Sequence, residues 1–278
     1  RNMMLQPPIA KQKPYNFTIN NITINDEYSW MRDPVWPAKV DDHDIISYLE
    51  QENDYSKAFF DQYQDLKSTL FEELKGRIKL SDQSAYVQKD DYLYYNRTEA
   101  DKDYPIYCRK YKSPDAIDEI ILDVNKLAKG REFTSLGALS ISPDHSMLAY
   151  SVDFNGDEKY TIRVLNLKTH EYLPDEIANT AGDIVWFLNN DGFFYTPVDE
   201  DLRHTKVMSH ILGHQNDQLI LQENDKLYNV SISSSGSREY LLINISGHDN
   251  NEYHTLDLTT NQPTPLLAIA RKESINYS

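Results

Sequence analysis

The stretch from Ser142 to Val164 reads SPDHSMLAYSVDFNGDEKYTIRV and contains two strand patterns separated by an acidic segment. Its Ser-Pro-Asp start and its Asn-Gly-Asp middle are turn chemistry, because Pro fixes φ, Asp and Asn bond nearby backbone, and Gly permits positive φ. Residues 147–152 are apolar and β-prone, and residues 160–164 alternate as on a half-buried strand. The stretch predicts a strand, a projecting acidic loop and a second strand, with function expected in the loop.

The same order of strand, polar loop and strand occurs four times after residue 85. The equivalent positions Leu93, Leu148, Phe193 and Leu241 are spaced 55, 45 and 48 residues apart. The first strands are Tyr92–Tyr95, Met147–Tyr150, Gly192–Tyr195 and Tyr240–Ile243, and the second strands are Tyr104–Tyr111, Tyr160–Leu167, Lys206–Leu212 and Glu252–Leu258. A repeat of this length built from antiparallel strands indicates propeller blades, with a meandering sandwich as the alternative. About four blades are few for a closed ring, so we expect an incomplete propeller.

The chain before residue 79 has a different pattern. Residues 1–25 are rich in Pro and Asn and predict an extended arm. From about Asp44, apolar residues recur every three or four positions as far as Ile78, which predicts helices, and the polar residues 62–65 allow a break into two. We therefore divide the chain into an arm with helices, residues 1–78, and the first blades of a propeller, residues 79–278.

Composition excludes several classes of protein. The formal net charge of −16 provides no basic footprint for nucleic acid or anionic lipid and favours cationic partners. The single cysteine, Cys108, allows no intramolecular disulfide and no zinc motif. No apolar run approaches a membrane span, and the first residues lack the apolar core of a signal peptide. We therefore expect a cytoplasmic protein without membrane contact.

Catalytic and cofactor motifs are missing from the sequence. It contains no Gly-x-Ser-x-Gly elbow, no phosphate-binding loop and no dinucleotide fingerprint. His204, His210 and His214 lack a helical register or cysteine partners, so we assign no metal and no cofactor. The paired carboxylates Asp157 and Glu158 are expected in a solvated loop. On these criteria alone the chain is a binding or gating module and carries no catalytic residue.

Several longer motifs nevertheless stand out. They are Asp26-x-Tyr28-x-Trp30-Met31-Arg32-Asp33, Tyr48-Leu49-x-x-Glu52-Asn53-x-Tyr55, Glu73-x-Lys75-Gly76-Arg77-Ile78, Tyr104-Pro105-Ile106-Tyr107-Cys108-Arg109, and Ser142-Pro143-Asp144 through Gly156-Asp157-Glu158-x-Tyr160. Together they resemble the prolyl oligopeptidase family, most closely its oligopeptidase B (protease II) branch. They occur in the family's order over nearly the whole chain. One departure is Asn20-Asn21, where the family has His-Gly, and it is expected to alter one turn.

The resemblance implies a serine peptidase that cuts short peptides after Arg or Lys. In the family a seven-bladed propeller covers an α/β-hydrolase domain and excludes large substrates. Residues 1–78 would pack on that domain, and residues 79–278 would be about four of the blades. The serine, aspartate and histidine of the triad lie in the C-terminal domain, which is absent here, so the chain is expected to be inactive alone. The loop residue matching Glu158 pairs with an arginine across the cleft between the domains, which makes Glu158 the candidate interdomain latch.

A second hypothesis stays open at this point. A stand-alone acidic propeller-like scaffold would use its charge to bind basic peptides or proteins.

We also predict that the chain associates with itself when no hydrolase domain is present. The apolar face of the arm would then be uncovered, with Phe59, Leu66 and Leu70, and strand edges would be left unpaired.

Overall fold

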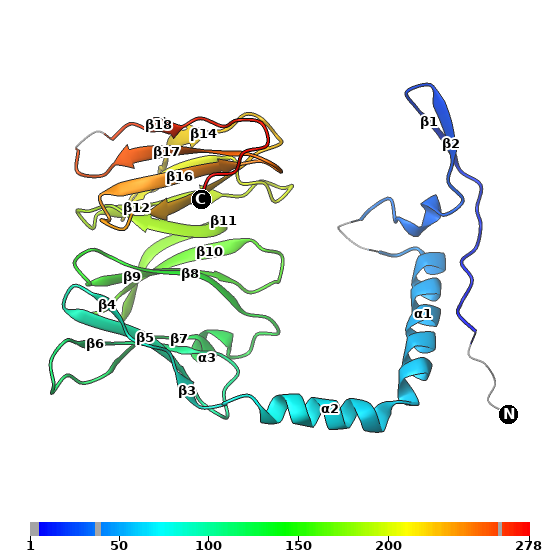
Figure 1. The fold of residues 1–278 in the computed structure, drawn as a ribbon, viewed down its shortest axis with the longest axis horizontal. Helices are drawn as coiled ribbons and strands as arrows, with labels where there is room; N and C mark the ends of the chain where they lie inside the picture. Colours follow the sequence, from blue (N-terminus) through cyan, green and yellow to red (C-terminus); the bar gives the residue numbers. More distant parts are fainter. Residues whose placement is uncertain (1–5, 37–39, 261–262) are drawn as a thin grey trace. The chain divides into compact units, whose positions relative to one another are not determined.

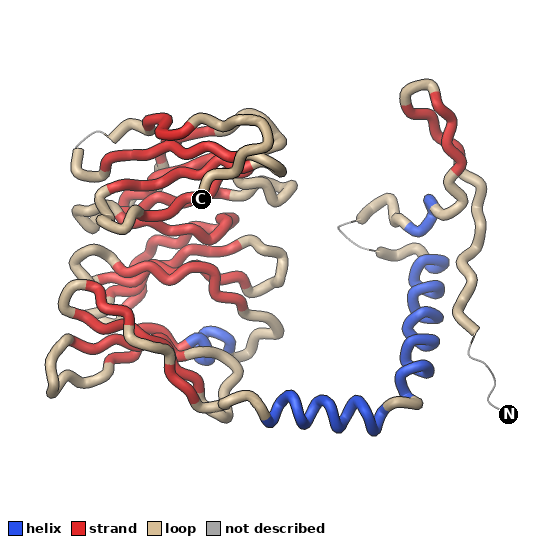
Figure 2. Tube along the Cα trace, in the orientation of Figure 1, coloured by secondary structure: helices blue, strands red, loops and turns tan. Residues whose placement is uncertain are grey.

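The computed structural model describes residues 6–36, 40–260 and 263–278. The chain forms two compact units, residues 1–79 and 80–278. The ribbon in Figure 1 labels their elements, and Figure 2 shows that strands dominate the second unit while the two long helices belong to the first. Across the described ranges, none of the helices combines the length and apolar character needed to cross a membrane. The fold is mainly β, as the sequence predicts.

The first unit begins with an extended arm and a hairpin. Strands β1 (Asn16–Ile19) and β2 (Ile22–Asn25) pair antiparallel through a two-residue turn. Both turn residues are left-handed, with φ of 50° at Asn20 and 63° at Asn21, a conformation that asparagine tolerates and that this tight hairpin requires. The departure from the family's His-Gly therefore lies at a turn that suits asparagine. A short 3₁₀ helix, η1 (Ser29–Met31), follows.

Two helices complete the first unit. α1 (His43–Asp61) begins at Asp42, whose carboxylate accepts the backbone N–H groups of Asp44 and Ile45. α2 (Gln64–Gly76) follows after residues 62–63, which confirms the predicted break. Of the described side chains in these two helices only Ile45 is buried, so the apolar stripe of α2 is open to solvent.

The family motifs of the arm hold this unit together. The Trp30 indole donates to the carbonyl of Lys11 over 2.7 Å, and its ring packs edge-on against Tyr48. The Asp33 carboxylate is 6% exposed and accepts the backbone N–H groups of Val35 and Asp42. These contacts fix the path of the arm.

The second unit consists of four antiparallel blades. The first contains β4 (Val87–Lys89), β5 (Tyr92–Thr98), β6 (Ile106–Tyr111) and β7 (Glu119–Asp123), and the short β3 (Asp82–Gln83) also pairs with β5. The second and third share one sheet of β8 (Ser135–Ile141), β9 (Met147–Asp153), β10 (Tyr160–Asn166), β11 (Glu171–Trp186), β12 (Gly192–Pro197), β13 (Lys206–Ile211) and β14 (Gln218–Gln222). The fourth contains β15 (Asn229–Ser234), β16 (Tyr240–Ser246), β17 (Asn251–Asp257) and β18 (Leu266–Ile269).

The predicted strands are the second and third strands of each blade. Several strand ends differ from the predicted ones, and the largest difference at the start of a strand is in β6, which begins at Ile106 and not at Tyr104. Pro105 has no N–H to donate to a ladder, and the backbone N–H of Tyr104 donates to the side chain of Asn125 instead. Asn125 belongs to α3 (Val124–Ala128), a short helix between the first and second blades.

The long strand β11 joins the second blade to the third. Its first half pairs with β10 and its second half with β12, and the register shifts between Thr180 and Ile184. Gly182 lies at this shift with φ of 101°, and its carbonyl accepts the buried Ser151 hydroxyl over 2.9 Å. A side chain at position 182 would meet both strain and the Ser151 hydroxyl.

An apolar cluster fills each space between neighbouring blades. The buried members between the first and second blades are Tyr94, Ile121, Leu122, Val124, Leu148, Tyr150, Val152, Leu165 and Leu167. Those between the second and third are Ala149, Ile162, Val164, Ile184, Trp186, Phe193 and Tyr195. Those between the third and fourth are Val185, Phe194, Val207, Val230, Ile232, Leu241, Ile243, Ile245 and Leu256. Packing of sheet face against sheet face is the arrangement of propeller blades, and four blades make a partial propeller.

The blades have two distinct ends. We call the end formed by residues 90–91, 142–146, 187–191 and 235–239, which connect the first and second strands of the blades, the turn face. The opposite end, formed by residues 99–105, 154–159, 198–205 and 247–250, is the loop face.

Candidate functional site

The predicted acidic loop lies at the loop face and is organised by one buried carboxylate. Asp153, the last residue of β9, is 2% exposed. Its two oxygens accept backbone N–H groups of Asn155, Gly156 and Glu158 over 2.8, 3.0 and 3.0 Å. Hydrogen bonds to an ionised carboxylate are stronger than neutral ones, so Asp153 fixes the path of the loop.

Glu158 is presented to solvent by this loop. Its backbone is left-handed, with φ of 60°, which is uncommon for a residue other than glycine. Within the described ranges the Glu158 carboxylate has no hydrogen bond and no ion pair. The loop thus holds an exposed carboxylate in a fixed position, an arrangement that suits a contact to a separate cationic group. That contact itself stays a prediction.

Aromatic packing supports the base of the same loop. The Arg131 guanidinium lies 3.8 Å from the centroid of the Phe154 ring, and the Phe133 ring lies beside Gly156. Both Arg131 and Phe133 come from the connection between α3 and β8, which leads from the first blade into the second, so this connection supports the loop. The base of the loop that carries Glu158 is therefore held both by Asp153 and by the α3–β8 connection.

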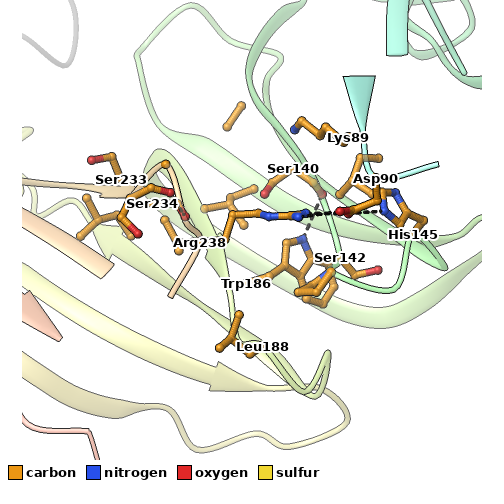
Figure 3. Close-up of a pocket in the computed structure, with 18 of the residues that line it drawn as sticks. Lys89, Asp90, Ser140, Ser142, His145, Trp186, Leu188, Ser233, Ser234 and Arg238 are labelled. Atoms are coloured by element: carbon orange, nitrogen blue, oxygen red, sulfur yellow. Dashed lines mark hydrogen bonds and ion pairs between the residues drawn. The ribbon is translucent and has the colours of Figure 1, made fainter. Parts of the chain in front are cut away.

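A second feature, a cavity of ≈ 600 Å³, lies at the turn face. The first strands of all four blades line it, with residues 87–89 of β4, 138–141 of β8, 183–186 of β11 and 232–234 of β15. This turn-face cavity is the axial space of the partial propeller. Figure 3 shows Arg238 reaching toward Asp90 and His145, with Lys89, Ser140 and Trp186 around them.

Charged side chains connect three blades across the turn-face cavity. Arg238 makes two hydrogen bonds to the Asp90 carboxylate, of 2.8 and 2.9 Å, and His145 Nε2 lies 2.9 Å from the same carboxylate. The other His145 nitrogen, Nδ1, is 2.7 Å from the Tyr94 hydroxyl. The hydrogen bonds from Arg238, and then from His145, hold the pKa of Asp90 well below its usual range.

These residues occupy one repeated position. Asp90, His145, Asn190 and Arg238 each lie three residues before the repeat positions at 93, 148, 193 and 241. All four are left-handed, with φ of 52°, 60°, 67° and 65°. The Asn190 side chain accepts the backbone N–H of Asp144 over 2.9 Å, so the third blade joins the same network. The repeat spacing contains this signal, but the sequence prediction followed the acidic loop and missed it.

The histidines noted in the sequence have local partners. His210 is buried between Asp175 and Asp217, at 2.9 and 2.7 Å, and connects the second and third blades. His204 bonds the carbonyl of Val230, and His214 is exposed. Among the residues that the structure describes, no group of three or more His, Cys, Asp or Glu side chains is arranged to hold a metal. In the same ranges no serine hydroxyl is hydrogen-bonded to a histidine ring.

Comparison with known proteins agrees with this architecture. Residues 7–278 match the family model described as the N-terminal β-propeller domain of prolyl oligopeptidase. The chain belongs to the prolyl oligopeptidase family. Protease 2 of Moraxella lacunata is 32% identical over 280 residues, which cover 97% of this chain and 40% of that protein. Dipeptidyl aminopeptidase BI of Pseudoxanthomonas mexicana is 31% identical over 265 residues, which cover 88% of this chain and 36% of that protein.

Solved structures of the prolyl oligopeptidase family show the same fold. Oligopeptidase B from Leishmania major superposes with a TM-score of 0.83 at 29% identity and covers 97% of this chain and 40% of its own. Oligopeptidase B from Trypanosoma brucei, with covalently bound antipain in a closed form, gives 0.82 at 29% identity and the same coverage. The chain thus spans about 40% of the length of these oligopeptidases. The resemblance seen in the motifs is confirmed, as is the partial propeller.

Proposed function

We propose that this chain is the arm and gating propeller of a serine oligopeptidase that cuts short peptides after Arg or Lys. The observation that carries the proposal is the family match over residues 7–278, joined to a loop-face carboxylate, Glu158, that has no partner within the described ranges. The matched model is the N-terminal domain of its family and the relatives are longer, which favours a catalytic portion encoded after this chain. In this proposal the propeller restricts which substrates reach that portion.

The path of the chain favours the loop face as the side that meets a catalytic portion. The chain comes into the propeller at β3, where Asp82 pairs with Thr98 at the loop-face end of β5. A domain connected through this segment would sit at the end of the blades that presents Glu158.

The first test is the activity of the chain alone. We expect no hydrolysis of an Arg-containing chromogenic dipeptide by the purified chain, because the proposed triad lies outside it. Mass spectrometry of the sample would exclude contaminating peptidases. Hydrolysis by the pure chain would contradict the assignment of the chain to a gating portion.

The second test concerns the coding DNA after Ser278. We expect a reading frame with a Gly-x-Ser-x-Gly elbow, the turn that presents the serine of an α/β-hydrolase. A frame that closes without such an elbow would overturn the proposal. It would favour instead the acidic scaffold, which predicts saturable and salt-sensitive binding of cationic peptides by the chain alone.

The third test examines the latch in the protein made from the full reading frame. Glu158→Gln should lower kcat/KM for an Arg substrate about fivefold, the effect of losing one partly exposed ion pair of about 1 kcal/mol. The matched control is Asp157→Asn, which removes a neighbouring charge from the same loop. Equal effects of the two substitutions would show that general charge is responsible and that Glu158 is no latch.

A further inference from the structure

A histidine lies between two carboxylates at the junction of the second and third blades. The His210 ring, on β13, has Nδ1 2.7 Å from an Asp217 oxygen and Nε2 2.9 Å from an Asp175 oxygen. The side chains of His210, Asp175 and Asp217 are 6%, 4% and 17% exposed, so water offsets little of their charge. Among the residues that the structure describes, no lysine or arginine forms an ion pair with either carboxylate. In that part of the chain the imidazole is the group that can balance them.

An irregularity in β11 brings one of these carboxylates to the ring. The ladder between β10 and β11 shifts register around residues 173–175. Pro174 lies within this shift, where its missing N–H costs no ladder hydrogen bond. Because a bulge re-aims the side chains beside it, Asp175 leaves the sheet of its own blade. Its Oδ1 atom reaches His210 and also accepts the backbone N–H of Gly213 over 2.6 Å.

The second carboxylate is held by a tyrosine. The Tyr195 hydroxyl, on β12, donates to Oδ2 of Asp217 over 2.6 Å. Burial, and then this hydrogen bond, raise the pKa of Tyr195, so the hydroxyl keeps its proton and acts as a donor. Asp217 therefore accepts from Tyr195 with one oxygen and faces His210 with the other.

Both nitrogens of the His210 ring thus face acceptor oxygens. A neutral imidazole has one N–H and one lone pair, so it can donate to only one of the two carboxylates. Its other nitrogen would place a lone pair against a carboxylate oxygen in a site with little water. The imidazolium donates to both, and hydrogen bonds between charged groups are stronger than neutral ones.

We propose that His210 is a doubly protonated, charged clasp between the second and third blades, and that loss of one ring proton to solvent loosens this junction. The charged groups that contact the ring among the described residues are Asp175 from β11 and Asp217 from the segment after β13. From β12, Tyr195 acts through Asp217, and the Phe193 ring packs at 5.3 Å as an apolar neighbour. The clasp depends on residues of the propeller alone, so it is independent of the proposed peptidase function.

The nitrogen resonances of the ring report its charge. The chain is labelled with ¹⁵N-histidine and examined by two-dimensional NMR at pH 7.5, where an exposed histidine is mostly neutral because its ordinary pKa is about 6.5. The exposed His214 is the internal control, and its signals are those lost in His214→Gln. The His210 signals are those moved by Asp217→Asn. We expect both His210 nitrogens to resonate as protonated and coupled to hydrogen, unlike those of His214. An unprotonated His210 nitrogen would overturn the proposal.

The pH dependence of stability tests the clasp itself. Urea denaturation compares the wild-type chain with His210→Gln at pH 6 and pH 9. Because folding favours the charged ring, the advantage of the wild type is present at low pH and declines as the pH rises. We expect its ratio of folding equilibrium constants to fall about tenfold, the effect of losing one charge-assisted hydrogen bond of about 1.4 kcal/mol.

Two further variants make this result specific. His214→Gln removes a histidine from the same segment and should follow the wild type at both pH values. If His210→Gln does not fold, Asp217→Asn replaces it, because it removes one of the charges that the imidazolium pairs with and keeps the shape of the side chain. An advantage of the wild type that is equal at pH 6 and pH 9 would show that His210 acts through packing alone and would overturn the proposal.

Discussion

The two faces of the propeller treat charge in opposite ways. At the turn face, Asp90, His145 and Arg238 come from three blades and satisfy one another. At the loop face, Asp153 accepts backbone N–H groups of its own loop, and the Glu158 carboxylate has no partner among the residues that the structure describes. The same blade architecture thus has one end that is held together within the chain and one end that presents a carboxylate outward. In our proposal, the loop face is the side that meets a protein partner.

Removing the buried carboxylate of the loop should have the largest effect on stability. Asp153→Ala leaves three backbone N–H groups without their acceptor, and we expect a loss of about 3 kcal/mol in the free energy of unfolding. Urea denaturation followed by circular dichroism measures it. Asp157→Ala, in the same loop but exposed, should change stability by less than about 0.5 kcal/mol. Equal effects would mean that Asp153 does not organise the loop face.

Breaking the turn-face network should have a smaller effect on the stability of the propeller. Asp90 and Arg238 are 46% and 49% exposed, so solvent weakens their attraction, and we expect a coupling of about 1 kcal/mol. A double-mutant cycle with Asp90→Asn and Arg238→Met measures it, and 1 M salt should reduce it. A coupling energy of zero at low salt would show that the Asp90–Arg238 pair does not stabilise the propeller.

The same pair predicts a pH dependence. Because the folded-state pKa of Asp90 is depressed below the ordinary value of 3.8, its contribution to stability is present above that pH. It is lost as the pH falls below 3.8 toward the folded-state pKa. The stability difference between the wild-type chain and Asp90→Asn should therefore be larger at pH 7 than at pH 3. A difference that grows on acidification would contradict the assigned pairing.

The smallest effect on stability is expected at Glu158. Its carboxylate has no partner in the described residues, so Glu158→Gln should change the free energy of unfolding of this chain by less than about 0.5 kcal/mol. Urea denaturation in parallel with the Asp90→Asn variant provides the comparison. A loss as large as that of Asp90→Asn would show that Glu158 has a structural role within the propeller.

The sequence predicts the blades well because their strands alternate with a period of two and recur at similar spacing. It also predicts the helix break at residues 62–65, where polar residues interrupt the apolar stripe. It does not predict β11 as one strand, since the passage through Gly182 depends on contacts with Ser151 of another strand. A sequence pattern records local preference, whereas this strand is set by packing between blades.

The candidate site is predicted only in part. The acidic loop with Glu158 is visible because it is contiguous and matches a family motif. The turn-face network is not, because Asp90 and Arg238 are 148 residues apart and meet only when four blades are arranged around one axis. Residues 233–236, at the end of β15 and in the turn that follows it, line the turn-face cavity beside Arg238. Positions equivalent in a repeat are where such a search should begin.

Hydrogen exchange tests most directly whether the loop face meets a catalytic portion. It is measured by mass spectrometry on this chain and on the protein made from the full reading frame that contains it. If the loop face meets a catalytic portion, residues 154–159 should exchange more slowly in the longer protein, while residues 89–91, 144–146 and 236–239 of the turn face should be unchanged. Unchanged exchange of residues 154–159, or protection confined to the turn face, would contradict a contact at the loop face.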